Sequence, residues 1–248
     1  STPMEYAKAL CAHAKEQGLE VPIYTTGANF FVKEPEKELE RLCRHIDIAA
    51  ECKIPLLRHD VAWGYYEGYT GIKSYKKVIE AVAPLVRQAA EYARERGVKT
   101  CSENHGYLLQ DSVRMLELFA AVDHPNYGFL CDMGNFTVVD EDCATAVSAL
   151  SDYIVHVHAK DMLVRSGMNF DPGRGYNLSR GGNYWRGTIF GHGNVPTFQI
   201  LSAIRKSGYD GYVSLEFEGM EPVLEGVEIG TQNLQHMIEV IGEGQRYV

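Results

Sequence analysis

The sequence lacks the features by which several large classes of protein are recognised. Its six cysteines form no C-x-x-C pair, which in a chain of 248 residues indicates reduced thiols rather than a disulfide framework. The 24 basic residues are outnumbered by 33 acidic ones, and the net charge of −9 argues against a nucleic-acid or membrane-surface partner. No apolar run approaches the roughly 18 residues of a membrane span, and nothing resembles a signal peptide. Together these absences predict a cytoplasmic protein.

The sequence does contain four acidic or imidazole side chains that each end a short apolar run. They are Glu103 in VKTCSENHG, Asp132 in YGFLCDMGNF, His158 in IVHVHAKDM and Glu216 in YVSLEFEG. Each run is typical of a buried strand and is followed by helical periodicity, which predicts parallel strands. Since the carboxyl ends of parallel barrel strands meet at one mouth, we expect the four side chains to converge there and to bind one divalent cation.

The alternation of strands and helices predicts an α/β fold, and we expect a single (β/α)₈ TIM barrel over residues 1–248. Only six strands are recognisable, and the chain opens on a helix start, with Pro3 and Glu5 behind a Ser or Thr cap. We therefore expect the first strands of the barrel, about two by typical element lengths, to be absent from this chain. The alternative is a complete open sheet of six strands, which would also place a site at the strand carboxyl ends.

Taken singly, such an acidic residue is more often a helix cap or turn residue than a ligand, and such a histidine is more often a satisfied core residue. The set favours metal binding, because charged side chains are rarely buried unless they are paired or bound to metal. Glu216 and Glu218 are two positions apart and so lie on one side of an otherwise apolar strand, and His156 and His158 repeat this pattern.

The order of these motifs resembles the sugar phosphate isomerase/epimerase family, which has the xylose isomerase-like barrel. The motifs are SENHG, CDMGN, HVHAKD, the G-x-G of GHGNVP, and SLEFEG. The family includes ketose 3-epimerases, inosose isomerases and dehydratases, and hydroxypyruvate isomerases. The resemblance implies that Glu103, Asp132, His158 and Glu216 are the metal ligands. The chain departs from the family in carrying His192 where an acidic residue usually stands inside the G-x-G motif.

The chemistry that the resemblance implies is proton transfer next to a carbonyl group. A mostly oxygen ligand set with one imidazole suits Mn²⁺, with Mg²⁺, Co²⁺ or Zn²⁺ as alternatives. The metal would polarise the substrate carbonyl and stabilise a cis-enediolate. Glu103 and Glu216 would remove and return the proton, in an order that stays open, and His105 is a rival base.

Other residues near the predicted mouth are candidates for binding the substrate. They are Arg58, His59, Trp63, Asn135, Lys160, Arg165 and His192. The polar, glycine-rich stretch over residues 166–194 is too long for an ordinary loop, and we interpret it as an active-site lid or an interface arm.

The leading functional hypothesis is a metal-dependent isomerase or epimerase acting on a sugar or polyol carbonyl. A metal-dependent lyase, either an inosose dehydratase or a C-glycoside deglycosylase, is the alternative within the same fold. A non-catalytic sugar-binding subunit also stays open. A DNA-repair endonuclease is disfavoured by the acidic charge and by Asn135, where that branch has a histidine. The expected partner is a small sugar or polyol, with a homo-oligomer implied only by the resemblance.

Overall fold

The structure is a computed structural model that describes residues 2–243. Contacts divide the chain into two compact units, Ser1–Leu109 with Arg114–Phe129, and Gln110–Val113 with Leu130–Val248. The boundaries fall just before and inside α4 (Ser112–Val122), and inside β4 (Tyr127–Asp132). Each unit is described in turn. None of the helices in the described part of the chain has the length and apolar character of a membrane span.

The first unit alternates helices with parallel strands. Its elements are α1 (Pro3–Glu16), β1 (Ile23–Thr26), α2 (Pro35–Glu51), β2 (Leu56–His59), α3 (Tyr75–Arg94), β3 (Lys99–Glu103), most of α4 and the first half of β4. Its strands lie in the order β1-β2-β3-β4, and the parallel register pairs Thr26 with His59 and Arg58 with Cys101. This register brings the carboxyl ends of β1, β2 and β3 to the same edge.

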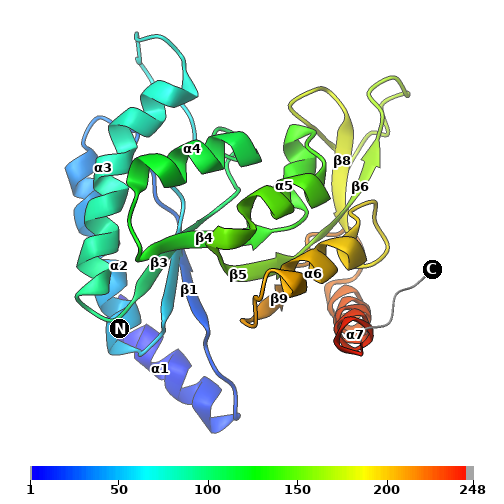
Figure 1. Ribbon diagram of the computed structural model, residues 1–248, viewed down its shortest axis with the longest axis horizontal. Helices are drawn as coiled ribbons and strands as arrows, with labels where there is room; N and C mark the ends of the chain where they lie inside the picture. Colours follow the sequence, from blue (N-terminus) through cyan, green and yellow to red (C-terminus); the bar gives the residue numbers. More distant parts are fainter. Residues whose placement is uncertain (1, 244–248) are drawn as a thin grey trace. The chain divides into compact units, whose positions relative to one another are not determined.

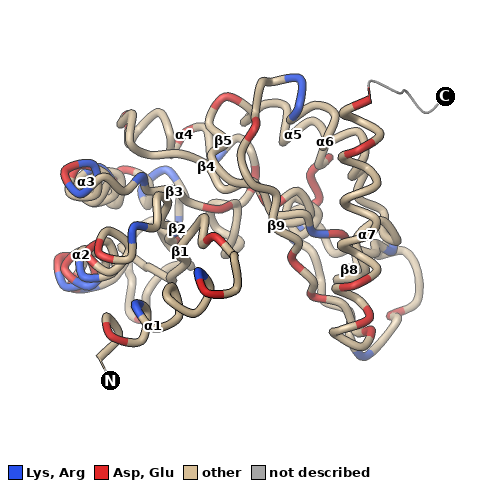
Figure 2. Tube along the Cα trace, turned by 90° about the horizontal axis from the view of Figure 1, so that it is seen from below, with Lys and Arg blue, Asp and Glu red and all other residues tan. Residues whose placement is uncertain are grey.

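Helices α2 and α3 lie side by side in this unit (Figure 1) because each has one apolar face and one charged face. On α2, Leu42, Ile46 and Ala49 are fully buried, and on α3 so are Val78, Val82 and Val86. Lys and Arg alternate with Asp and Glu on the outer sides of both helices (Figure 2). This is the amphipathic pattern that the sequence shows at helical spacing.

The second unit contains the second half of β4, then β5 (Ile154–Ala159) and β9 (Val213–Leu215), in the order β4-β5-β9. β5 and β9 are parallel, with His158 opposite Ser214. The helices are α5 (Cys143–Leu150), α6 (Thr197–Lys206) and α7 (Val223–Gly242), with the short 3-10 helices η1 (Asn135–Val139) and η2 (Ser151–Tyr153). All six strands expected from the sequence are therefore present.

The segment that follows His158 forms a second, antiparallel sheet that the sequence did not predict. Its strands are β6 (Asp161–Arg165), β7 (Asn177–Leu178) and β8 (Tyr184–Thr188), in the order β6-β8-β7, and Leu163 pairs with Arg186. We call this sheet and its loops, residues 161–188, the arm. Part of the stretch interpreted as a lid or interface arm is thus regular β-structure, and its role stays a prediction.

Asp161 gives the G-x-G motif a structural role. Its carboxylate is 1% exposed and accepts backbone N–H bonds from Gly193 at 2.8 Å and Gly191 at 3.0 Å, as well as from Met162 and Val195. A Cβ atom at position 193 would lie 2.1 Å from Asp161 Oδ1, so only glycine fits. The turn that carries His192 is therefore held by one buried carboxylate.

Candidate metal centre

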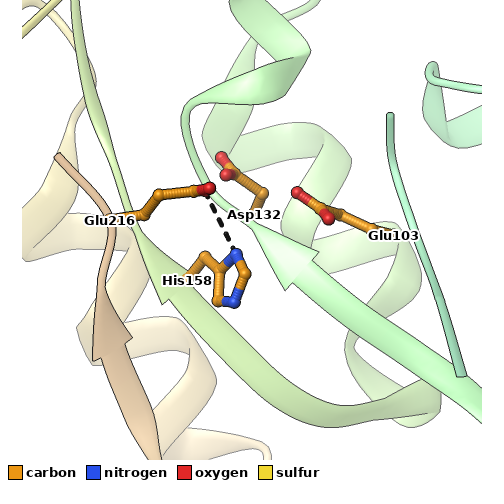
Figure 3. A group of neighbouring side chains, drawn as sticks. All are labelled: Glu103, Asp132, His158 and Glu216. Atoms are coloured by element: carbon orange, nitrogen blue, oxygen red, sulfur yellow. Dashed lines mark hydrogen bonds and ion pairs between the residues drawn. The ribbon is translucent and has the colours of Figure 1, made fainter. Parts of the chain in front are cut away.

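Three of the four predicted ligands lie together in the second unit. Asp132 ends β4, His158 is the fifth residue of β5, and Glu216 directly follows β9, so all three stand at strand carboxyl ends. One nitrogen or oxygen atom from each lies within 4.8 Å of the others. Figure 3 shows the three side chains pointing toward one another, with His158 Nδ1 3.2 Å from Glu216 Oε2. The convergence that parallel strands predict is therefore present among these three residues.

Local bonds fix how Asp132 presents its carboxylate. Oδ1 accepts the backbone N–H groups of Gly134 at 2.8 Å and Asn135 at 2.9 Å, and the residue has no exposed surface. Gly134 leaves no room for a side chain, because a Cβ atom there would lie 2.9 Å from the Lys160 carbonyl oxygen. The sequence D-M-G-N thus holds Oδ1 in a turn and leaves Oδ2 directed at the cluster.

A buried lysine stands among these carboxylates. The Lys160 side chain is 3% exposed, and its Nζ lies 2.8 Å from Glu216 Oε2 and 3.1 Å from Asp132 Oδ2. It also lies 3.2 Å from Glu218 Oε2. Burial favours the neutral amine, but attraction to the three carboxylates outweighs it and raises the pKa of Lys160 above its usual value. The cluster is therefore built around a positive charge.

Glu216 is correspondingly held as a carboxylate. Burial alone would favour the neutral acid, but the hydrogen bond from His158 and the charge of Lys160 hold the pKa of Glu216 well below its ordinary range. Carboxylate oxygens and one imidazole nitrogen are ligands that Mn²⁺, Mg²⁺ and Zn²⁺ accept. The donor set of the second unit thus fits a divalent cation.

Glu103, the fourth member of the candidate group drawn in Figure 3, belongs to the first unit. It ends β3 and is 7% exposed. Its Oε2 lies 2.7 Å from Arg58 Nη2, and the same nitrogen lies 2.7 Å from Asp60 Oδ1. Arg58 therefore bridges two buried carboxylates at the carboxyl ends of β2 and β3. Asp60 was missed at the sequence level, although it directly follows a strand as the other acids do.

His105 and Trp63 stand beside this ion pair. His105 Nδ1 lies 3.0 Å from Asp60 Oδ1, so Nε2 is the ring nitrogen that does not face Asp60. Trp63 is 58% exposed, donates its indole N–H to the Ala28 carbonyl at 2.9 Å, and meets the His105 ring edge-on. Both retain exposed surface, as their predicted roles require.

The remaining candidates differ in how accessible they are. His59 has no exposed surface, packs between Phe30 and Tyr127, and burial lowers its pKa to about 4, so it is a neutral core histidine. Asn135 is 4% exposed and its Oδ1 lies 3.3 Å from Lys160 Nζ. Arg165 and His192 are exposed, on the arm and on the turn that Asp161 holds. We accordingly leave His59 out of the proposed site.

The Asp60–His105 pair gives a first prediction. The hydrogen bond to Asp60 outweighs burial and raises the pKa of His105 above its usual value. Replacing Asp60 with Asn should therefore lower the pKa of His105, which an NMR titration of the imidazole protons would measure. His45, which bonds the Tyr24 hydroxyl in the same unit, is the internal control, since its titration should not change. An unaltered His105 titration would show that Asp60 does not control this histidine.

The geometry defines an α/β protein with parallel strand–helix units and a candidate metal centre at the strand carboxyl ends. Residues 2–241 match the family model described as the xylose isomerase-like TIM barrel. The chain therefore belongs to that family, which confirms both the resemblance and the barrel fold class drawn from the sequence.

Two inosose dehydratases are among its relatives. The protein of Lacticaseibacillus casei is 28% identical over 142 residues, which cover 56% of this chain and 47% of the relative. That of Lactiplantibacillus plantarum (strain ATCC BAA-793 / NCIMB 8826 / WCFS1) is 29% identical over 157 residues, covering 60% and 51%. The chain thus spans about half the length of the curated relatives it matches.

Solved structures support the same fold. A D-tagatose 3-epimerase-like protein superimposes with a TM-score of 0.75 at 18% identity, covering 98% of this chain and 85% of that one. A xylose isomerase-like TIM barrel protein from Mycobacterium smegmatis, in complex with magnesium, gives a TM-score of 0.70 at 17% identity, with coverages of 97% and 79%. At these identities the likeness concerns the fold alone.

Proposed function

We propose that the chain is a divalent-metal-dependent isomerase or epimerase acting on a ketose, an inosose or a related polyol carbonyl. The observation that carries the proposal is the convergence of Asp132, His158 and Glu216 around the buried Lys160 ammonium at strand carboxyl ends. Asp132, His158 and Glu216 would hold the metal, and we propose Glu103 as the fourth ligand. When bound, the metal supplies Lewis-acid polarisation of a carbonyl and so acidifies the neighbouring C–H bond.

The residues of the chain supply the proton transfer. Glu216 is held ionised by His158 and Lys160 and is therefore able to accept a proton from carbon near neutral pH. Glu103 is the proposed second carboxylate, which returns the proton. Arg58, 2.7 Å from Glu103 Oε2, orients that carboxylate. Trp63, exposed after β2, offers an apolar wall for a sugar ring.

A metal-dependent lyase is the second candidate, and two observations favour it. The relatives include inosose dehydratases, and the Asp60–His105 pair is a ready acid–base group in addition to the two glutamates. In a dehydration, His105 would protonate the leaving hydroxyl after the C–H proton is removed. The two activities differ in product, because a dehydratase releases water and an epimerase leaves the mass unchanged.

The test begins with metal content. The purified protein should hold about one metal ion per chain after Mn²⁺ loading, and a His158→Ala variant should lose it; elemental mass spectrometry measures both. Solvent-deuterium uptake into D-tagatose, D-allulose and inosose, followed by NMR and mass spectrometry, then separates the epimerase from the lyase. A protein that binds a metal but exchanges no C–H proton would instead be a sugar-binding subunit. Absence of metal under every loading condition would refute the proposal.

A further inference from the structure

Glu218 lies at the edge of the candidate metal centre but is not one of its ligands. It is two residues beyond Glu216, and its carboxylate reaches the same lysine as that of Glu216. Its Oε2 lies 3.2 Å from Lys160 Nζ, the nitrogen that also contacts Glu216 and Asp132. The Glu218 side chain is 52% exposed, against 34% for Glu216 and none for Asp132. Of the three carboxylates, that of Glu218 is the most open to a bound molecule.

The arm holds Glu218 in this position. Gly187 of β8 forms a parallel bridge with Gly219, directly after Glu218. A Cβ atom at Gly187 would lie 2.4 Å from the Glu218 carbonyl oxygen and 3.1 Å from its Cβ, so a larger residue would displace Glu218. Gly187 thus allows β8 of the arm to pack directly against the backbone of Glu218 and Gly219, beside the cluster.

The surroundings of Lys160 show why Glu218 can bind a further group. An ammonium has three protons, but four oxygen atoms lie within 3.3 Å of Lys160 Nζ, from Glu216, Asp132, Glu218 and Asn135. They cannot all accept a bond from it at once. Because Glu218 is the most exposed of the four, its carboxylate gives up this contact at the lowest cost.

The charge of the cluster limits what that group can be. Asp132, Glu216 and Glu218 surround a single ammonium, so the second unit presents an excess of negative charge here. A bound divalent cation would offset this excess without reversing it, and Lys160 is already engaged by carboxylates, so no positive charge is left over here for a phosphate or carboxylate. A neutral hydroxyl, in contrast, can donate to a carboxylate that retains free lone pairs.

We propose that Glu218 is a substrate-binding residue that accepts a hydrogen bond from a neutral substrate hydroxyl, and that Gly187 of the arm positions it. This inference rests on the proposed function and specifies its substrate class. Because Glu216 and Glu218 both contact the same Lys160 nitrogen, the hydroxyl belongs to a carbon close to the reacting one. The substrate is then a polyhydroxylated carbonyl compound without a phosphate at that end.

The test compares Glu218→Ala and Glu218→Gln in the Mn²⁺-loaded protein, using deuterium uptake into the best of D-tagatose, D-allulose and inosose. Losing a hydrogen bond to a charged acceptor should lower kcat/KM about 10- to 100-fold in the alanine variant, mostly through KM, and less in the glutamine variant, which keeps an acceptor oxygen. Metal content should stay at the wild-type value. Glu228→Gln removes an exposed acidic charge from α7 and should change nothing.

Gly187→Ala tests the role of the arm. It should raise KM as Glu218→Ala does, and the double variant should be no worse than the worse single one, because both act through the same carboxylate. Additive losses, or a fall in kcat with KM unchanged, would overturn the positioning role. Thermal unfolding of each variant identifies any loss of folded protein, and the glutamine variant keeps the test available if alanine impairs folding.

Binding of xylitol to the Mn²⁺-loaded protein, measured by calorimetry, separates this inference from the proposed function. If the protein exchanges no C–H proton but binds xylitol with an affinity that depends on Glu218, the isomerase function is refuted and the substrate-binding role of Glu218 is supported. If Glu218→Ala exchanges at the wild-type rate, the isomerase function is supported and the substrate-binding role of Glu218 is overturned. Neither exchange nor xylitol binding would overturn both.

Discussion

Replacing Glu216 with glutamine is expected to lower solvent-deuterium uptake into the substrate by about 10²- to 10⁴-fold at pH 7, the usual value of a positioned general base. Glutamine matches the shape of glutamate and keeps one acceptor oxygen for Lys160, 2.8 Å away in the wild type. It has no carboxylate to accept a proton from carbon. The loss should therefore appear in kcat rather than in KM, as NMR-detected exchange rates across substrate concentrations would show.

The pH dependence of the wild type gives an independent check of the same role. Because the pKa of Glu216 is held well below its ordinary range, the carboxylate stays ionised through the mildly acidic range. Exchange that depends on this base should thus not decline between pH 7 and about pH 5 through loss of Glu216 ionisation. A decline in that range that occurs at constant metal content and persists in Asp60→Asn would contradict Glu216 as the base with a lowered pKa.

Matched variants decide whether the loss of deuterium uptake is specific to Glu216. Glu228→Gln on α7 makes the same chemical change at an exposed position and should exchange at the wild-type rate. Metal content of Glu216→Gln must be measured after Mn²⁺ loading, so that only loaded protein is compared. A loaded variant that still exchanges at more than a tenth of the wild-type rate would remove Glu216 from the proton-transfer step.

The parts of the fold that could be predicted are those encoded within short stretches of sequence. Each of the six expected strands is a compact apolar run, and each apolar helix face repeats at helical spacing, so both can be recognised locally. Asp132, His158 and Glu216 could be placed together because parallel strands bring their carboxyl ends to one edge.

The arm could not be predicted because its strands depend on distant pairing. Leu163 lies opposite Arg186 across an intervening stretch rich in glycine, and no single run there has the alternating apolar pattern of a half-buried strand. Gly187 would be expected to weaken a strand, yet it is required where Glu218 approaches. Only the paired structure shows why glycine stands there.

The charges and contacts around the candidate site also could not be predicted from the sequence. Lys160 was predicted to contact substrate, because nothing in HAKD shows that its ammonium turns toward Asp132 and Glu216. Likewise, the contacts of Asp60 with Arg58 and His105 depend on side-chain directions that spacing does not determine. Motif order identifies ligand positions, whereas the charges that tune them come from packing.

Replacing Lys160 with methionine is expected to lower the free energy of unfolding by about 3–5 kcal/mol at pH 7, the usual cost of removing one partner from a buried ion pair. Methionine fills a similar volume without the charge, so Asp132, Glu216 and Glu218 would face one another without a compensating ammonium. Urea-induced unfolding of the metal-free protein measures the change. Lys206→Met, at an exposed position in the last turn of α6, is the control and should alter stability little.

The pH dependence of this loss has a definite sign. In the wild type the folded-state pKa of Glu216 is depressed, so its contribution to stability is present above the unfolded pKa of about 4.3 and is lost as the pH falls through the folded value. In the variant the uncompensated carboxylates take up protons more readily, so stability should rise as the pH falls from 7 toward 5. The two proteins should therefore differ most at neutral pH and converge on acidification.

Divalent metal connects this prediction to the candidate site. A cation that binds the folded cluster would replace part of the missing positive charge, so Mn²⁺ should stabilise the Lys160→Met variant, by about 2.7 kcal/mol at a hundredfold excess over its Kd. Mn²⁺ should raise the free energy of unfolding of Lys206→Met only as much as it raises that of the wild type. If Lys160→Met were as stable as the wild type without metal, the ammonium could not be what holds the three carboxylates together.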